Sequence, residues 1–245
     1  MKVSVFDGGD MRFIYLKKLL QDDGFEIDDK AENIILPLPL NESAFRQFDF
    51  FSKLCNRDLN GTKIFGGCVC EAIRDHFEKL GADVYDYMQS ESVLRFNASL
   101  TVEAALCIGT EKSDCGYIGS HCLITGFGRI GMRLCSALRS LGANVTVAVR
   151  NFDKFPIIES AGAIACDINK LPSLNEFDFI FNTVPSVVIT ETIPSECTAI
   201  ELASKDGFAN MQNVILARGL PGKYSPLSAA KAIHISVLDY LKGED

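Results

Sequence analysis

The sequence lacks an excess of positive charge. It has 24 lysine and arginine residues against 32 aspartate and glutamate residues, which gives a formal net charge of -8. No local basic patch offsets this balance, so the chain would repel a polyphosphate duplex. Nucleic acid is therefore not expected as a partner.

Long apolar runs are missing as well. No stretch reaches the roughly 18 consecutive uncharged apolar residues that a membrane span requires. Near the amino terminus, the apolar run meets Asp7, Gly8, Gly9 and Asp10 before the core of a signal peptide could form. These absences predict a cytoplasmic protein that does not associate with a membrane. The hydrophobic fraction of 47% supplies enough apolar residues for one large domain or two modest ones.

Paired cysteines are also absent. The nine cysteines are scattered and odd in number, and only Cys68 and Cys70 are closely spaced. No second cysteine or histidine pair lies near them to complete a tetrahedral metal site. The expected core positions include four others, Cys107, Cys122, Cys135 and Cys166. We therefore expect reduced, structural cysteines and no metal.

Histidine is scarce, with three residues in the chain. His76 falls in a predicted helix, His121 opens a predicted strand, and His234 lies in the last predicted helix. None of them lies on a loop that follows a strand, so a histidine acting as a general acid or base is not evident. All three are interpreted as structural or surface residues.

Short apolar runs alternate with helical patterns along the whole chain, which is typical of βαβ units. Two series of such units predict an α/β protein with two Rossmann-like domains, the second a doubly wound parallel sheet. The first series has predicted strands near residues 2–7, 33–36, 62–65 and 83–86, with helices near 11–22, 43–54 and 69–80. The second has predicted strands near residues 121–125, 144–149, 163–166, 178–182, 198–201 and 213–217.

A glycine-rich turn follows the first strand of the second series. It reads Gly126-Phe127-Gly128-Arg129-Ile130-Gly131, and an amphipathic helix continues from it. In such a turn the first glycine permits the tight bend, the second lets the main chain approach a pyrophosphate, and the third lets the helix pack closely on the sheet. The main-chain amides and the helix dipole favour phosphate at this position. The alternative is a Rossmann turn kept only for packing. We predict that it binds a nicotinamide dinucleotide.

The end of the next strand bears on the choice of cofactor. An acidic residue that would accept a hydrogen bond from a ribose 2′-hydroxyl is missing there, and Arg150 stands in its place. A guanidinium attracts a 2′-phosphate, so NADP is the first choice and NAD the second. The alternative interpretation is an exposed arginine without a role.

Four segments follow from these patterns. We predict a Rossmann-like substrate domain over residues 1–92, a crossing helix and linker over 93–119, an NAD(P)-binding domain over 120–224, and a last helix over 225–245. The crossing helix is expected from about Ser92 to Lys112, and the last helix from Pro226 to about Leu241. The last helix has an apolar stripe and is expected to pack at the domain junction.

Several motifs together resemble the dipicolinate synthase A subunit family. They are Gly8-Gly9-Asp10-x-Arg12, Asn97-Ala98-x-x-Thr101-Val102-Glu103, the glycine-rich turn, Asn182-Thr183-x-Pro185, Leu202-Ala203-Ser204 and Gly219-Leu220-Pro221-Gly222-Lys223. The last motif is the most specific. The layout is more distantly similar to D-2-hydroxyacid and alanine dehydrogenases.

The resemblance implies an oxidoreductase that transfers a hydride from a dihydrodipicolinate-type ring to NADP during sporulation. It implies a partner, a flavoprotein-like B subunit, and a place in the mother-cell cytoplasm of a spore-forming bacterium. A homo-oligomer is also expected. Because the substrate that the resemblance implies is a small dicarboxylate, the cations Lys205, Arg218 and Lys223 on loops after the strands suit it. Arg12 and Arg95 are further candidates, with ordinary surface charge as the alternative.

Candidate site residues can be grouped by role. The candidate catalytic residues are Glu103 and Lys205. Glu103 is chosen because a carboxylate in an apolar helical stretch should have a raised pKa and accept a ring proton; the alternative is a carboxylate on the helix surface. The candidate cofactor-binding residues are Gly126, Phe127, Gly128, Arg129, Ile130, Gly131, Arg150, Asn182, Thr183, Val184, Pro185, Ala203 and Ser204. The candidate substrate-binding residues are Asn97, Thr101, Arg218, Gly219, Leu220, Pro221, Gly222 and Lys223.

The chain also departs from the family pattern. Its first domain is shorter, Lys205-Asp206-Gly207-Phe208 replaces an Arg-Pro-Gly-Gly-like stretch, and Ala104 and Ala230 stand where the family has glycine. These departures favour a second hypothesis, a non-catalytic NAD(P)-binding subunit that regulates or scaffolds another enzyme.

Overall fold

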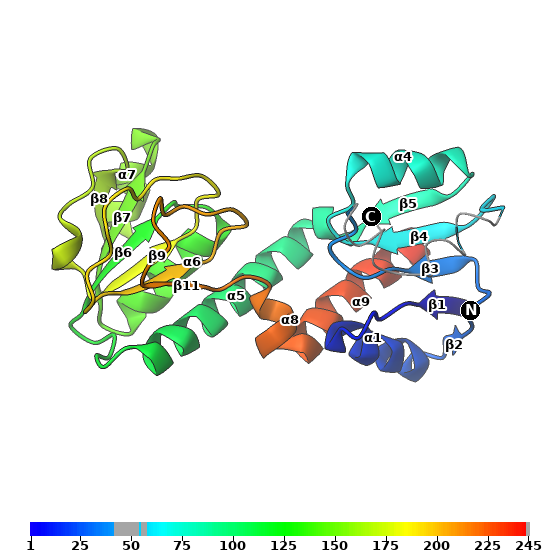
Figure 1. The fold of residues 1–245 in the computed structure, drawn as a ribbon. Helices are drawn as coiled ribbons and strands as arrows, with labels where there is room; N and C mark the ends of the chain where they lie inside the picture. The colour runs from blue at the N-terminus through cyan, green and yellow to red at the C-terminus, as the bar shows by residue number, and fades with distance from the viewer. Residues whose placement is uncertain (42–53, 55–57, 244–245) are drawn as a thin grey trace. The chain divides into compact units, whose positions relative to one another are not determined.

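The computed structural model describes residues 1–41, 54 and 58–243. The chain forms two compact units (Figure 1). The first unit contains residues 1–97 together with 225–245, and the second contains residues 98–224. The helix predicted near residues 43–54 lies outside the described residues except for Leu54.

The first unit is built on a parallel sheet with the strand order β2-β1-β3-β4-β5. Chain order reverses between β1 and β3, which makes the sheet doubly wound. The five strands are β1 (Lys2–Val5), β2 (Glu26–Ile27), β3 (Asn33–Ile35), β4 (Lys63–Gly66) and β5 (Asp83–Asp86). The four strands predicted for this unit are confirmed, whereas the two-residue β2 was not anticipated.

Helices cover both faces of this sheet (Figure 1). On one face α1 (Met11–Asp22) and α9 (Pro226–Lys242) lie side by side, and on the other lies α4 (Glu71–Lys79). Helix α1 begins after Asp10, whose carboxylate accepts a hydrogen bond from the main-chain N–H of Arg12. The apolar stripe of the last helix thus finds its partner within the first unit, against α1 and the strands.

Helix α5 (Glu91–Lys112) belongs to both units, because the division falls between Asn97 and Ala98. A 3-10 turn, η1 (Tyr87–Gln89), precedes it. The long helix predicted from Ser92 to Lys112 is therefore confirmed within one residue.

The second unit contains a six-stranded parallel sheet with the order β11-β10-β9-β6-β7-β8. This is the strand order of a complete dinucleotide-binding fold, with the reversal between β6 and β9. Its strands are β6 (His121–Thr125), β7 (Asn144–Val149), β8 (Ile164–Asp167), β9 (Phe179–Asn182), β10 (Thr198–Glu201) and β11 (Val214–Leu216). All six predicted strands are confirmed, and so is the predicted class of two parallel α/β domains.

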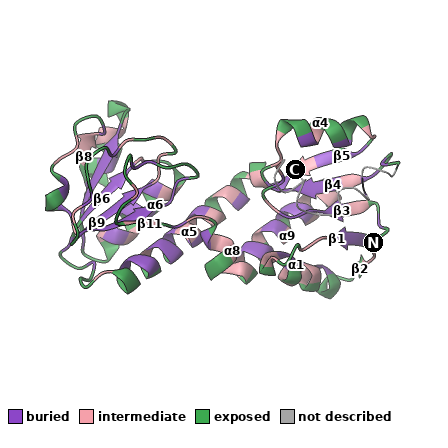
Figure 2. Ribbon diagram, viewed as in Figure 1, coloured by how far each residue is buried: buried purple, intermediate pink, exposed green. Residues whose placement is uncertain are grey.

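The two faces of the second sheet are covered differently. Helices α5, α6 (Arg129–Ser140) and α7 (Phe155–Ser160) pack on one face, which receives Cys122 and Ile124 from β6. Leu123 points to the opposite face, because neighbouring residues of a strand alternate. That face is covered mainly by irregular segments around η3 (Leu174–Glu176), and its core positions are nonetheless buried (Figure 2).

Some local predictions differ from the structure. Cys107 is exposed on α5, whereas it was expected in the core. The short elements η2 (Phe152–Lys154), α7 and α8 (Leu220–Tyr224) were not anticipated. Within the described residues, no helix combines the length and the apolar content needed to cross a membrane.

Candidate dinucleotide-binding site

The glycine-rich turn joins the carboxyl end of β6 to α6 at the point where the strand order reverses. Gly126 has a φ of +92°, a conformation that L side chains rarely adopt. A Cβ there would lie 2.6 Å from Thr183 Oγ1 and 2.9 Å from Val184 Cγ2. The role assigned to Gly126 in the tight bend is confirmed.

The other two glycines of the turn differ from each other. A Cβ on Gly131 would collide with the main-chain oxygen of Gly126. The close packing of the helix against the turn therefore requires glycine at position 131. A Cβ on Gly128 would meet nothing within 4 Å. Gly128 is also the N-cap residue of α6, and it has no side chain that could cap the first amides of this helix. The turn therefore leaves open space beside amides that can donate to phosphate oxygens.

A pocket of about 260 Å³ opens beside the turn. Its walls come from the carboxyl ends of β6, β7 and β8 and from the segment after β9. The lining residues are Gly126, Phe127, Val149, Arg150, Asn151, Lys154, Ile168 and Val184. Ligands bind at this edge of a doubly wound sheet, so the pocket lies where the adenosine half of a dinucleotide is expected.

Two cations line this pocket, and the described residues of its lining include no carboxylate. The Arg150 guanidinium donates a hydrogen bond from Nη2 to Ser186 Oγ at 2.7 Å. Lys154 Nζ lies 3.1 Å from the main-chain oxygen of Phe127, to which it donates. Both side chains are thus held at the pocket by neutral oxygens, which leaves their positive charges uncompensated by these contacts.

The segment after β9 is held by a buried polar network. Asn182, the last residue of β9, accepts from Thr125 Oγ1 at 2.5 Å and donates to the main-chain oxygen of Val184 at 2.9 Å. Thr183 Oγ1 donates to the main-chain oxygen of Thr125 at 2.7 Å. Because the Asn182 side chain is fully buried and engaged in these bonds, it shapes the segment that borders Gly126.

Glu201 extends this network to the next strand. Its Oε1 accepts from Asn182 Nδ2 at 2.7 Å and from the main-chain N–H of Ala203 at 2.8 Å. Its Oε2 accepts from the main-chain N–H of Gly207 at 2.7 Å. The buried carboxylate therefore fixes both ends of the loop that carries Ser204 and Lys205.

Two buried thiols of the second unit are not reactive groups. Cys122 lies in β6 with no exposed surface, and burial raises its pKa to about 11. Burial also raises the pKa of Cys197, just before β10, to about 12. Thiols with such pKa values stay protonated and packed at neutral pH. They have the structural role that the sequence predicted for Cys122.

Helix α5 carries three of the predicted site residues. Asn97 and Thr101 are spaced by four positions and so share a helix face; both are partly buried, and Asn97 Nδ2 lies 3.4 Å from Met88 Sδ. Glu103 is exposed, so it is a carboxylate on the helix surface. This position removes the apolar surroundings on which its selection as a proton acceptor depended.

The cations after β10 and β11 have different environments. Arg218 donates from Nε to the main-chain oxygen of Ala203 at 2.8 Å and pairs with Asp206 through Nη2 at 2.6 Å. It therefore braces the loop of Ala203 to Gly207. Lys205 is exposed on that loop, and Lys223 is exposed on α8.

The motif Gly219 to Lys223 was expected as a loop, but most of it forms the short helix α8. Gly219 precedes the helix with a φ of +67°. Leu220 is buried in the core of the second unit, so its side chain is committed to packing. Pro221 and Gly222 are partly buried.

The remaining predicted cofactor residues border the turn and the adjoining loops. Phe127 and Ala203 are buried, and Ile130 is partly buried against the core. The exposed members are Gly128, Arg129, Pro185 and Ser204.

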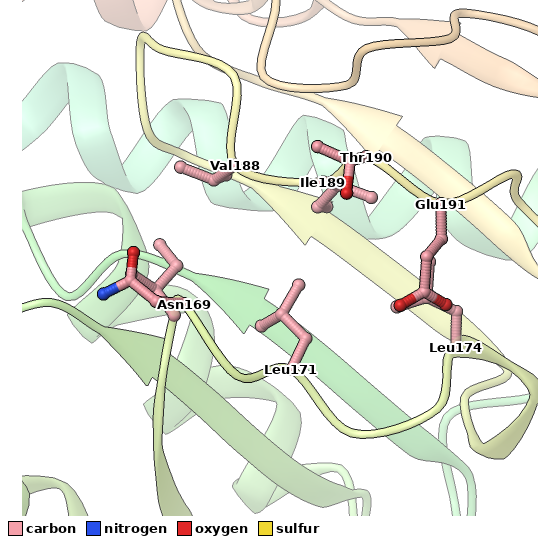
Figure 3. Close-up of a pocket in the computed structure, with 8 residues that line it drawn as sticks. Asn169, Leu171, Leu174, Val188, Ile189, Thr190 and Glu191 are labelled. Carbon is pink, nitrogen blue, oxygen red and sulfur yellow. The ribbon is translucent and has the colours of Figure 1, made fainter.

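A second, smaller pocket of about 100 Å³ lies among the irregular segments on the other face of the sheet (Figure 3). Asn169 and Leu171 come from the segment after β8, and Val188 to Glu191 come from the segment after β9 (Figure 3). Because ligand pockets are usually several times larger, we interpret this space as a packing gap.

Sequence reasoning missed Lys154, Asn151 and Ile168 in the larger pocket, and Glu201 in the buried network. Lys154 lies in the short turn η2, which was not among the predicted elements. Glu201 could have been identified from the sequence, because it is a charged residue at the end of an otherwise uncharged predicted strand. In the structure all residues of this strand are buried.

The chain was compared with known proteins in sequence and in fold. No family model matches the chain. A curated relative, the dipicolinate synthase A subunit of Bacillus subtilis (strain 168), is 29% identical over 168 residues. That match covers 64% of this chain and 56% of the relative, so it spans little more than half of the relative's length.

Solved structures share the fold. The dipicolinate synthase A subunit from Bacillus halodurans superposes with a TM-score of 0.79 and 21% identity, covering 98% of this chain and 97% of that one. D-lactate dehydrogenase from Escherichia coli superposes with a TM-score of 0.59 and 13% identity, covering 100% and 97%. The resemblance indicated by the sequence motifs is therefore confirmed in sequence and in fold, and so is the more distant likeness to dehydrogenases.

Proposed function

We propose that this chain is an oxidoreductase that resembles the dipicolinate synthase A subunit in activity and uses NADP. The observation that carries the proposal is the glycine turn beside a pocket whose described lining holds two cations and no carboxylate. The family resemblance of the sequence motifs suggests the substrate class, a dihydrodipicolinate-type ring.

The residues present fit a dinucleotide. The main chain at Phe127 to Ile130 would hold the pyrophosphate, because space is open at Gly128 and this N-cap residue has no side chain. Arg150 and Lys154 would hold a 2′-phosphate, because two cations at the pocket compensate its charge. NAD is the second choice, since it lacks the phosphate that would satisfy these cations.

The substrate carries two carboxylates, and cations suit them. Lys205 and Lys223 are exposed with no partner among the contacts of the second unit, all of whose residues the structure describes. Arg218 is oriented by Ala203 and Asp206, and the rest of Gly219 to Lys223 would contact the substrate through main-chain groups. Asn97 and Thr101 are proposed as further contacts, and Glu103 and Lys205 as candidates for moving the ring proton.

The bound cofactor supplies the acceptor for the hydride that leaves the ring, while the second hydrogen leaves as a proton to a base. The chain's own part is to hold the ring carboxylates and to accept that proton. We further propose that it works with a flavoprotein-like B subunit, forms a homo-oligomer, and acts in the mother-cell cytoplasm of a sporulating bacterium.

A turnover assay tests this proposal. Dihydrodipicolinate and NADP⁺ are mixed with the protein, with and without the B subunit of a dipicolinate synthase, and NADPH absorbance and dipicolinate are measured. Formation of both products in equal amounts is expected. Cofactor binding without turnover under either condition would instead support a non-catalytic NAD(P)-binding protein, which the exposed position of Glu103 and the altered Lys205 to Phe208 stretch favour.

A further inference from the structure

Glu201 is a buried acidic residue that the proposed chemistry does not use. It is the last residue of β10, its exposed fraction is 0%, and it pairs in register with Asn182 at the end of β9. The side chain lies at the carboxyl edge of the sheet, where dinucleotides bind in this fold.

The hydrogen bonds of Glu201 are those of an ionised carboxylate. Its three partners, Asn182 Nδ2 and the main-chain N–H groups of Ala203 and Gly207, are all donors. Both oxygens therefore act as acceptors, which is the pattern of partners that a carboxylate takes. The main chain at Gly207 packs directly against the Asn182 side chain, because a Cβ on Gly207 would collide with that side chain.

The charge of Glu201 is not neutralised by a cation of its own unit. Within residues 98–224, all of which are described, no lysine or arginine forms an ion pair with Glu201. Arg218, which is bound to the same loop, pairs with Asp206 instead. An unpaired buried charge is costly to fold, and such groups are concentrated at functional sites.

The two halves of the site consequently differ in charge. The adenosine half, over β6, β7 and β8, carries Arg150 and Lys154. In a dinucleotide fold the other mononucleotide half lies over the remaining three strands, here β9, β10 and β11, and receives the nicotinamide. That half has a buried negative charge at the end of its central strand.

We propose that Glu201 is a buried counter-charge that makes the site bind the oxidised cofactor in preference to the reduced one. A nicotinamide ring carries one positive charge when oxidised and none when reduced, so a nearby carboxylate attracts only the oxidised form. This inference rests on the proposed function, because it requires the dinucleotide to lie at this edge. It adds to the proposed function an order of affinities: the site binds NADP⁺, the hydride acceptor, more tightly than NADPH, the reduced product.

The test measures binding, without turnover. Dissociation constants for NADP⁺ and NADPH are determined by calorimetry for the wild type, Glu201→Gln and Glu196→Gln. Glu196 is the matched control, since it is exposed near the amino end of the same strand. Glu201→Gln is expected to shift the ratio of the two constants about five- to tenfold toward NADPH, whereas Glu196→Gln leaves it unchanged.

A second pair of variants leaves the buried network intact. Leu216 pairs in register with Glu201 from β11 and is 55% exposed. Leu216→Lys places a cation beside the carboxylate and should shift the ratio in the same direction, while Leu216→Gln should not. If Glu201→Gln does not fold, this pair decides the question.

An unchanged ratio in folded Glu201→Gln, or in Leu216→Lys where the first variant does not fold, overturns the inference and leaves the proposed function standing. Failure of the wild type to bind either cofactor overturns the proposed function, and the inference falls with it. The two failures are thus distinguishable.

Discussion

At the scale of single residues, Gly128 and Gly131 should respond differently to the same substitution. Gly131→Ala is expected to lower the free energy of unfolding by about 1–3 kcal/mol, because the added methyl group meets the main chain of Gly126. Gly128→Ala has open space and should leave stability within about 0.5 kcal/mol, yet obstruct the approach of phosphate and weaken cofactor binding. Thermal unfolding and NADPH fluorescence titration measure the two effects. Equal stability of both variants would contradict this account.

Arg150 and Lys154 should together set the preference for NADP. Replacing either with alanine is expected to raise the dissociation constant for NADPH about tenfold, because each cation contributes a charge-assisted contact to a 2′-phosphate. The constant for NADH should change little. Arg133→Ala is the control, since Arg133 is exposed on α6 and lies outside the pocket. An equal loss of affinity for NADPH and NADH would show that these cations do not contact the 2′-phosphate.

The conformation of the glycine-rich turn could be predicted from the sequence, because residue type encodes the main-chain conformation there. Gly126, Gly128 and Gly131 were identified because their spacing has one structural meaning after a strand. The environment of Glu103 was not predictable from its helical stretch, because a narrow polar stripe on an apolar helix still reaches solvent. Lys154 was missed because its position depends on the short turn η2.

At the scale of elements, the packing of α9 on α1 should contribute to the stability of the first unit. Ile233 is 2% exposed in the cluster that includes Phe13 and Leu16, whereas Ile235 on the same helix is 54% exposed. Ile233→Ala is expected to cost about 2–5 kcal/mol of unfolding free energy, and Ile235→Ala less than about 0.5 kcal/mol. Urea unfolding followed by circular dichroism provides the measurement. A small effect of Ile233→Ala would show that α9 does not contribute to this core.

Strand positions were predicted well because parallel strands buried on both faces read as continuous apolar runs. Residues 144–149 and 198–201 match β7 and β10 at both ends. Helix α8 was missed because Pro221 and Gly222 disfavour helix by intrinsic propensity, and burial of Leu220 in the core compensates for this. Such tertiary contacts cannot be predicted from the local amino-acid composition.

At the scale of the whole molecule, alkaline pH should destabilise the second unit. Burial raises the pKa of Cys122 to about 11, of Cys197 to about 12 and of Tyr117 to about 12. Unfolding returns these groups to values near 9 and 10, so the unfolded chain binds fewer protons above pH 9. Their contribution is complete below about pH 9 and is lost as the pH rises through about 11 and 12.

Between about pH 8 and pH 10 the loss should amount to about 3 kcal/mol. Urea unfolding at the two pH values measures it, and Cys122→Ala should reduce the slope by about a third to a half. Cys115→Ala, in which an exposed thiol is removed, serves as the control. A free energy of unfolding that stays constant over this range would contradict the prediction.

The discontinuous first unit also has a consequence for synthesis on the ribosome. Its core needs Ala230, Ile233 and Val237, which follow the whole of the second unit in the chain. The second unit can complete its sheet as soon as β11 has emerged, but the apolar side of α1 must wait uncovered until α9 is released. During that interval the nascent chain exposes an apolar surface in its amino-terminal segment. We therefore expect it to bind a chaperone that protects incompletely folded chains from aggregation.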